Sequence, residues 1–179
     1  PDVIRAQRIA TGEADLVLGC DMLTAGGQES IAKTRAGRTA MIVNAHQQPP
    51  GQFAREPDWR FPDAEIRNRI AEAVGERSEF VDATRLATAL VGDAIATNLF
   101  MLGFAWQRGL VPVSEPAIQR AIELNDVAVE KNKQAFAWGR RAATDLERVR
   151  RIAMPAQGVV VEMPRTLATL IRSRAKLLA

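Results

Sequence analysis

The chain has 179 residues, enough for one domain or for one domain with an appendage. Apolar residues make up 47% of it, an ordinary share for a soluble core, and the formal net charge is +3. No stretch approaches the run of about 18 apolar residues that crosses a membrane, and the first residues show no signal-peptide pattern. We therefore expect a soluble, cytoplasmic protein without a membrane partner.

Cysteine, histidine and charge narrow the possible sites further. Cys20 is the single cysteine, which excludes a disulfide framework and a self-contained iron–sulfur cluster, since a cluster normally needs about four thiolates. With His46 as the single histidine, a zinc site of the usual Cys/His type is not expected either. The basic runs 140–151 and 165–176 alternate with apolar residues at helical spacing. We interpret them as solvated helix faces and expect no nucleic-acid partner.

The first part of the chain alternates between helical and strand-like patterns. A short helix is predicted over 1–10, and the apolar run 14–20 (ADLVLGC) predicts a buried strand by its length and its valine and leucine content. The segment 28–36 has a helical pattern, with Gly37 following it as the C′ glycine. The run 38–43 (RTAMIV) predicts a second buried strand.

A long, proline-rich loop over 44–62 precedes the next elements. Asp63 is expected to cap a helix that runs to about Val74 and stops at Gly75. The run 78–83 (SEFVDA) then predicts a third strand. This alternation of strands and helices favours βαβ units, because parallel neighbouring strands need crossover connections.

The second half of the chain is helical in pattern. Helices are predicted over 86–90, 93–109, 114–124, 127–138 and 143–152, followed by a short strand over 159–161 and an amphipathic helix over 164–178. The predicted fold class is therefore α/β: a partial doubly wound, mainly parallel sheet of about three strands with a helical C-terminal half. We assign this domain to residues 1–145, and 146–179 to a C-terminal helical extension or a linker to a next domain.

Polar residues at the predicted strand ends are the first candidates for a ligand site. In open α/β sheets, ligands bind beyond the carboxyl ends of the strands, which selects Cys20, Asp21, Asn44, Ala45, His46, Asp82 and Thr84 here. Of these, Asp21, Asn44 and His46 are the candidates for contact with a ligand or with another domain. Capping of the following helix or turn is the simpler interpretation of Asp21, and likewise of Asp82. His46 is a candidate proton shuttle by its residue type, but no nucleophile and orienting group accompany it. We therefore predict no catalytic residue.

Two residues inside the predicted helix 93–109 do not fit simple core packing. Asn98 is surrounded by apolar positions, so its amide should either bond to a strand-end backbone group or be exposed at an interface. Gly103 lowers helix stability by about 1 kcal/mol relative to alanine unless another group approaches closely. Asn132 and Gly139 raise the same question. We regard Asn98 and Gly103 as candidates for contact with a ligand or with another domain.

The segments ATNLFMLGFAWQRGL (96–110) and NKQAFAWG (132–139) resemble the gamma domain of 2-oxoacid:ferredoxin oxidoreductases. That family usually shows Asn-x-x-x-Leu-Gly on one helix and Asn-x-x-Ala-Phe-x-x-Gly further on. Here these positions are Asn98, Leu102, Gly103, Asn132, Ala135, Phe136 and Gly139. The resemblance extends over about 8–145, and the loop 46–62 is most similar to the fused, single-chain indolepyruvate branch.

This resemblance implies oxidative decarboxylation of a 2-oxoacid, such as the aryl pyruvate indolepyruvate, to an acyl-CoA with reduction of ferredoxin. Thiamine diphosphate, Mg and [4Fe-4S] clusters would belong to other domains, and no cofactor is expected in this chain. The family's GxGGQG turn is absent, so we expect a piece of a longer polypeptide that is inactive alone. The implied partners are the other domains, ferredoxin and coenzyme A, and an exposed sheet edge would favour a homo-oligomer.

A second interpretation stays open, in which the chain is a free-standing nucleotide-binding or protein-interaction α/β module. The turn before the helix 28–36 contains Gly26 and Gly27 and could offer backbone N–H groups to an anion. It matches neither GxGxxG nor a P-loop. A GxGGQG turn encoded upstream of Pro1 would favour the oxidoreductase interpretation, whereas a native start codon there would favour the module.

Overall fold

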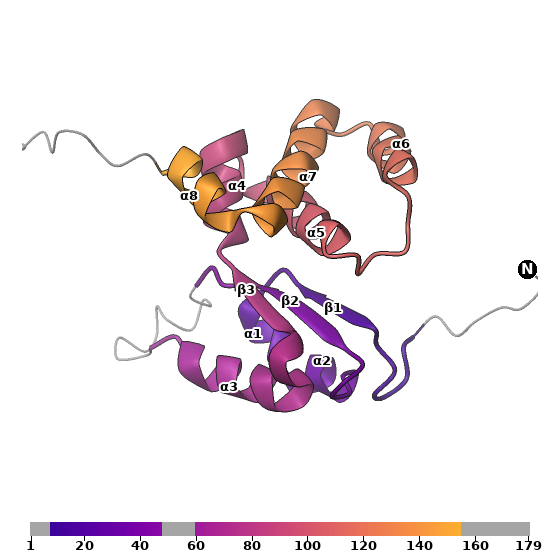
Figure 1. Ribbon diagram of the computed structural model, residues 1–179, viewed down its shortest axis with the longest axis vertical. Helices are drawn as coiled ribbons and strands as arrows, with labels where there is room; N and C mark the ends of the chain where they lie inside the picture. Colours follow the sequence, from indigo (N-terminus) through magenta and orange to yellow (C-terminus); the bar gives the residue numbers. More distant parts are fainter. Residues whose placement is uncertain (1–7, 48–59, 155–179) are drawn as a thin grey trace, which may run out of the picture.

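A small parallel sheet organises the molecule, for which a computed structural model describes residues 8–47 and 60–154. Its strands are β1 (Leu16–Gly19), β2 (Ala40–Asn44) and β3 (Ser78–Val81), in the order β1-β2-β3, and both neighbouring pairs are parallel. In Figure 1 the sheet and the helices of the first half of the chain form the lower part of the molecule, and the C-terminal helices form the upper part. The predicted α/β class with a partial parallel sheet is confirmed.

The central strand β2 separates two hydrophobic cores. All of its residues are buried, and successive side chains point to opposite faces of the sheet. Met41 and Val43 pack with α1 (Met22–Ala25) and α3 (Asp63–Val74) on one face. Ile42 packs on the other face, in a core shared with the C-terminal helices. Both faces of the sheet are therefore covered, as a parallel sheet requires.

The helix α3 buries Ile66, Ile70 and Val74 and stops at Gly75, whose φ of 65° is in the left-handed region, as the sequence predicts. The predicted cap at Asp63 is wrong, because Pro62 occupies the N-cap position and Asp63 is the first helical residue. The Asp63 carboxylate instead accepts a 2.8 Å hydrogen bond from Nε of Arg67, one turn further on.

The predicted helix 28–36 is too long, since α2 (Gln28–Ala32) ends at Ala32. Two backbone N–H groups that precede β1 donate to the carbonyls at the end of α2. Gly12 N–H bonds to Ala32 O and Ala14 N–H bonds to Lys33 O, each at 3.0 Å. The residues after α2 then turn around Thr39, whose buried hydroxyl donates to Ala14 O at 2.6 Å. Tertiary contact with the lead-in to β1 thus ends the helix before Gly37.

The C-terminal half is helical. Its elements are α4 (Ala83–Val91), the 3-10 turn η3 (Ala94–Ala96), α5 (Thr97–Gln107), α6 (Glu115–Asn125), α7 (Val129–Thr144) and α8 (Leu146–Ala153). In the first half of the chain, a further 3-10 turn, η2 (Gly75–Arg77), connects α3 to β3. Helix α7 lies against α4, α5, α6 and α8, and α5 also reaches β1 and β2. Its central position in Figure 1 makes α7 the axis of this half.

Several helices of this half begin or end at residues other than those predicted. Helix α4 starts earlier than predicted because Asp82 caps it, with Oδ1 accepting from Arg85 N at 3.1 Å. Helix α7 continues past Trp138 to Thr144, and α8 then starts after Asp145, which caps it through Arg148 N at 2.9 Å. Because α8 packs on α4 and α7, it is continuous with this half, and the domain division at residue 145 stays a prediction.

Some predicted elements fall beyond the described part of the chain. These are most of the helix 1–10, the middle of the loop 44–62, the strand 159–161 and the helix 164–178. Within residues 8–47 and 60–154, no helix has the combined length and apolar character needed to cross a membrane.

Candidate functional site

Asn44, the last residue of β2, links the carboxyl ends of the whole sheet. Its Nδ2 donates to Cys20 O beyond β1 at 3.0 Å and to the Thr84 hydroxyl beyond β3 at 2.8 Å. Its Oδ1 accepts from Ala83 N at 3.0 Å and from His46 N at 3.2 Å. The residue is only 4% exposed. A primary amide suits this place because it is both donor and acceptor, and here both functions are used.

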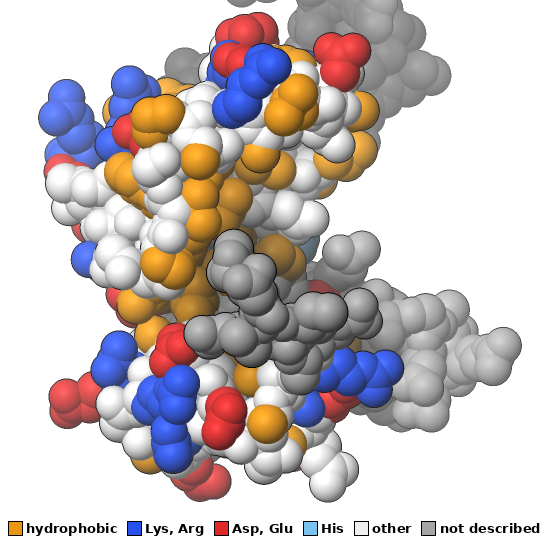
Figure 2. Space-filling view, turned by 90° about the vertical axis from the view of Figure 1, so that its right-hand side faces the viewer, with side chains coloured by type: hydrophobic (Ala, Val, Ile, Leu, Met, Phe, Trp, Pro, Cys, Tyr) orange, Lys and Arg blue, Asp and Glu red, His pale blue; other side chains and the backbone are white. Residues whose placement is uncertain are grey.

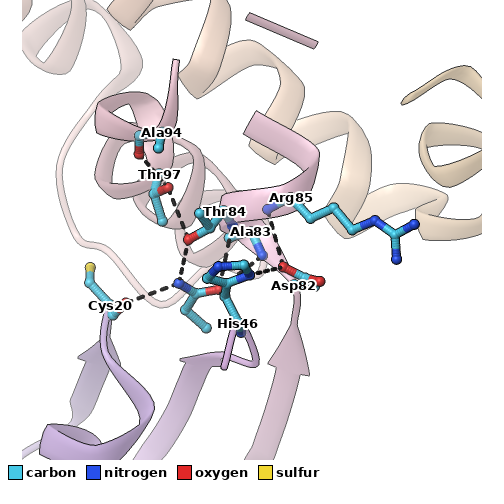
Figure 3. Close-up of polar contacts among 9 residues, drawn as sticks. Cys20, His46, Asp82, Ala83, Thr84, Arg85, Ala94 and Thr97 are labelled. Carbon is cyan, nitrogen blue, oxygen red and sulfur yellow. Dashed lines mark hydrogen bonds and ion pairs between the residues drawn. The ribbon is translucent and has the colours of Figure 1, made fainter. Parts of the chain in front are cut away.

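The cluster extends from the sheet to the start of α5. The hydroxyl oxygens of Thr84 and Thr97 lie 3.2 Å apart, and Thr97 also donates to Ala94 O at 2.6 Å. Figure 3 shows these residues above the ends of the strands, with Cys20 and His46 on either side. We name Cys20, Asn44, His46, Asp82, Thr84 and Thr97 the carboxyl-edge cluster. A continuous chain of polar contacts thus connects β1, β2, α4 and α5.

His46 and Asp82 lie side by side in the carboxyl-edge cluster. Nδ1 of His46 lies 3.3 Å from Oδ1 of Asp82, and the side chains are 38% and 37% exposed. Figure 3 shows the imidazole beside this carboxylate, which also caps α4. A histidine held by a carboxylate can accept and pass on a proton. Within the described residues, no hydroxyl or thiol forms a hydrogen bond with His46, so a nucleophile–base pair is not assembled here.

The remaining strand-end residues have structural explanations. Oδ1 of Asp21 accepts from Thr24 N at 2.7 Å and so caps α1, a helix the sequence analysis missed. The capping interpretation of Asp21 and Asp82 is confirmed. Cys20 is half-buried, and this burial raises the pKa of its thiol. Since the thiolate is the reactive form, Cys20 has the character of an unactivated thiol.

Asn98 and Gly103 lie apart from these contacts. Asn98 is exposed on α5 and forms no bond to a strand-end backbone group in the part of the chain that the structure describes, and the expected interface at this position stays a prediction. Gly103 is buried where α5 crosses α7: a Cβ added to it would come within 2.1 Å of Phe136 O. The relation is reciprocal, since a Cβ on Gly139 would come within 1.9 Å of Phe100 O. The glycines of the two sequence motifs therefore bring the two helix backbones together.

Asn132, which shares the second motif with Gly139, bonds within its own turn, with Nδ2 donating to Val127 O at 2.8 Å. Within the described residues, no hydrogen bond joins Asn98 to the carboxyl-edge cluster. Contact of Asn98 or Gly103 with a ligand or another domain stays a prediction.

Sequence reasoning missed two features of this half. Thr97 was not selected, although its position directly before Asn98, at the start of an apolar helix, is a place where hydroxyls commonly bond to the backbone. The basic run 140–151 was interpreted as a solvated face, and the hollow that part of it lines was not foreseen.

The donor groups of this chain do not fit the metals of the resembled family. Across residues 8–47 and 60–154, no group of three or more His, Cys, Asp or Glu side chains is placed to hold a metal ion. A single cysteine in the 179-residue sequence cannot supply the thiolates of a [4Fe-4S] cluster. We therefore assign no chemical step of this chain to such a group.

A parallel sheet with both faces covered, and with polar groups gathered at its carboxyl edge, defines a partial α/β domain. The sequence pattern of the pyruvate ferredoxin/flavodoxin oxidoreductase family matches residues 2–142, most of the chain. The chain therefore belongs to this family, and it is a domain of a 2-oxoacid:ferredoxin oxidoreductase. Searches among curated proteins and among solved structures found no match. The resemblance seen in the sequence is confirmed at the level of the family.

Proposed function

We propose that the chain is the gamma domain of a fused, single-chain oxidoreductase that decarboxylates an aryl pyruvate such as indolepyruvate. The family match over 2–142 carries this proposal, and the similarity of the loop 46–62 to the indolepyruvate branch supports the aryl substrate. In the parent reaction the 2-oxoacid loses carbon dioxide, its acyl group passes to coenzyme A, and the released electrons pass to ferredoxin. Thiamine diphosphate, Mg and [4Fe-4S] clusters are supplied by other domains.

Within that enzyme the chain has a supporting role. The carboxyl-edge cluster uses most of its polar groups on internal hydrogen bonds, which fixes the ends of the strands relative to α4 and α5. The pair of His46 and Asp82 has no nucleophile beside it in the described structure. On this proposal the domain positions neighbouring domains and helps to bind the acyl acceptor, and the isolated chain turns over no 2-oxoacid.

The experiment compares the isolated chain with the full polypeptide encoded by the same reading frame. We expect ferredoxin reduction that depends on indolepyruvate and coenzyme A from the full enzyme, and more slowly from pyruvate. The isolated chain should show no turnover, no bound thiamine diphosphate and no cluster absorbance. Turnover by the isolated chain, or a full enzyme that reduces ferredoxin with no 2-oxoacid, would overturn the proposal.

A variant of the full enzyme tests the supporting role. Asn98 on α5 and Gln134 on α7 are both exposed amides without an internal hydrogen bond in the described structure. If the surface around Asn98 meets another domain, Asn98→Ala lowers ferredoxin reduction while Gln134→Ala does not. Equal rates in both variants would place the inter-domain contact elsewhere and remove Asn98 from the proposal.

A further inference from the structure

A hollow with a volume of about 650 Å³ lies where α7 turns into α8. This volume is within the range of about 300–1,000 Å³ that is usual for small-molecule sites. Residues from the second half of α7 line one wall, and residues of α8 line the other. It is separate from the carboxyl-edge cluster, because the two share no residue.

The charged groups of the hollow favour an anion. Arg140, Arg141 and Arg148 line it, and Asp145 is the single carboxylate among its lining residues. Asp145 is occupied as the cap of α8. Arg140 is partly neutralised, since it pairs with Glu115 and bonds to Gln107 at 3.1 Å. The positive charge available to a ligand therefore comes from the other two arginines.

Arg141 and Arg148 form no ion pair within the described residues, whereas Arg140 beside them pairs with Glu115. The guanidinium of Arg141 lies over the ring of Trp138, with its Cζ 4.8 Å from the ring centroid. This cation–π contact holds Arg141 in place and leaves its N–H donors available. One arginine from each helix thus offers forked donors at the same hollow.

The rest of the lining is apolar. Trp138, Val149 and Ile152 contribute to it, and Ile152 is 50% exposed although it is a large hydrophobic residue. A simple inorganic anion would leave this apolar surface in water, whereas a ligand with an aromatic or aliphatic body would cover it. Thr144, which lies between Arg141 and Arg148 in the sequence, adds a neutral hydroxyl group to the lining.

We propose that this hollow is a binding site for a small organic oxyanion, in which a carboxylate or phosphate lies between Arg141 and Arg148 and an aromatic body packs on Trp138 and Ile152. The site does not depend on the proposed oxidoreductase function. It requires only the charges and apolar groups that α7 and α8 place together.

The test uses the 179-residue chain, with binding measured by calorimetry and by the fluorescence of Trp138 in a background in which Trp59 and Trp106 are phenylalanine. The probes are phenylpyruvate, phenyl phosphate, inorganic phosphate and benzyl alcohol. We expect at least one of the two aromatic anions to bind about tenfold more tightly than either inorganic phosphate or benzyl alcohol, because it satisfies both parts of the site. The better of the two identifies carboxylate or phosphate as the preferred group.

Variants locate the binding. Arg141→Ala and Arg148→Ala should each weaken it about tenfold, since each removes charge-assisted hydrogen bonds. Lys131→Ala removes the same charge from the first part of α7, about 15 Å along the helix from Arg141, and should leave binding unchanged. All three side chains are exposed, and circular dichroism verifies the fold. Absent binding, equal binding of all anions, or equal weakening by Lys131→Ala would overturn the proposal.

Discussion

The side chain of Asn44 provides hydrogen-bond partners that the ends of neighbouring strands would otherwise lack. Strand β2 ends at Asn44, and the backbone groups of Cys20, Ala83 and His46 all bond to its amide. Because Asn44 is almost completely buried, water cannot replace these bonds. The stability of the carboxyl edge should therefore depend strongly on this residue.

We expect Asn44→Ala to lower the free energy of unfolding by about 3 kcal/mol, since it leaves several buried donors and acceptors unsatisfied. Asn98→Ala is the matched control: it removes the same side chain from an exposed position and should change stability by no more than about 0.5 kcal/mol. Urea unfolding followed by circular dichroism measures both. Equal midpoints for the two variants and the original chain would show that the amide has no structural role.

At this scale the sequence could select residues but not their partners. The rule that ligands bind at strand ends selected Asn44, His46, Asp82 and Thr84 among others. The structure brings these four together, whereas Asp21 caps α1. The contact of Asn44 with Thr84 joins residues that are far apart in the sequence. Hydrophobic periodicity carries no information on such a pair, because both residues are polar and neither belongs to the apolar positions from which strands and helices are predicted.

The crossing of α5 and α7 is the main packing contact between helices in the molecule. Gly103 and Gly139 each lie against a backbone carbonyl of the other helix, and Phe100 and Phe136 fill the space beside them. Small residues at a crossing let two helix backbones approach closely. Packing within the domain thus explains why glycine occurs at positions 103 and 139 of the two sequence motifs.

Gly103→Ala and Gly139→Ala should each lower the free energy of unfolding by about 2–4 kcal/mol, because the new methyl group has no space. Helix propensity alone predicts the opposite sign, a gain of about 1 kcal/mol, so the experiment separates the two effects. Gln134→Ala, at an exposed position of α7, is the control for the gain in propensity. Thermal unfolding of the variants measures the result, and stabilisation by either glycine variant would contradict the close approach.

At the scale of elements, periodicity predicted the existence of the strands and of most helices better than their ends. The apolar runs are local, so β1, β2 and β3 were located from the sequence. The end of α2 depends on bonds to the lead-in of β1, and the length of α7 depends on its neighbours. Gly103 indicated that something approaches α5 closely, but only the tertiary structure could show that it is α7.

The molecule as a whole has two cores on the faces of one sheet, and its surface retains apolar groups that these cores do not absorb. Figure 2 shows hydrophobic side chains in a band over the helical half. Among the exposed large hydrophobic residues, Leu124 is 69% and Val127 is 62% exposed, and they flank the corner between α6 and α7. Contiguous apolar surface of this kind often marks a contact with another protein.

These groups should make the 179-residue chain self-associate when it is studied alone. Two kinds of surface can carry the contact: the corner at Leu124 and Val127, and the edges of the described sheet at β1 and β3, where backbone groups can pair with another chain. Sedimentation velocity over a range of concentrations should show a dimer or larger species at high concentration.

The double variant Leu124→Glu, Val127→Glu should weaken association at least about tenfold, because it removes apolar burial and adds like charges. Asn125→Glu adds a charge at the same corner without removing an apolar group and should have a smaller effect. Association that persists unchanged in the double variant would assign the contact to a sheet edge, and a chain that stays monomeric at every concentration would show that the apolar corner and the sheet edges are both inert.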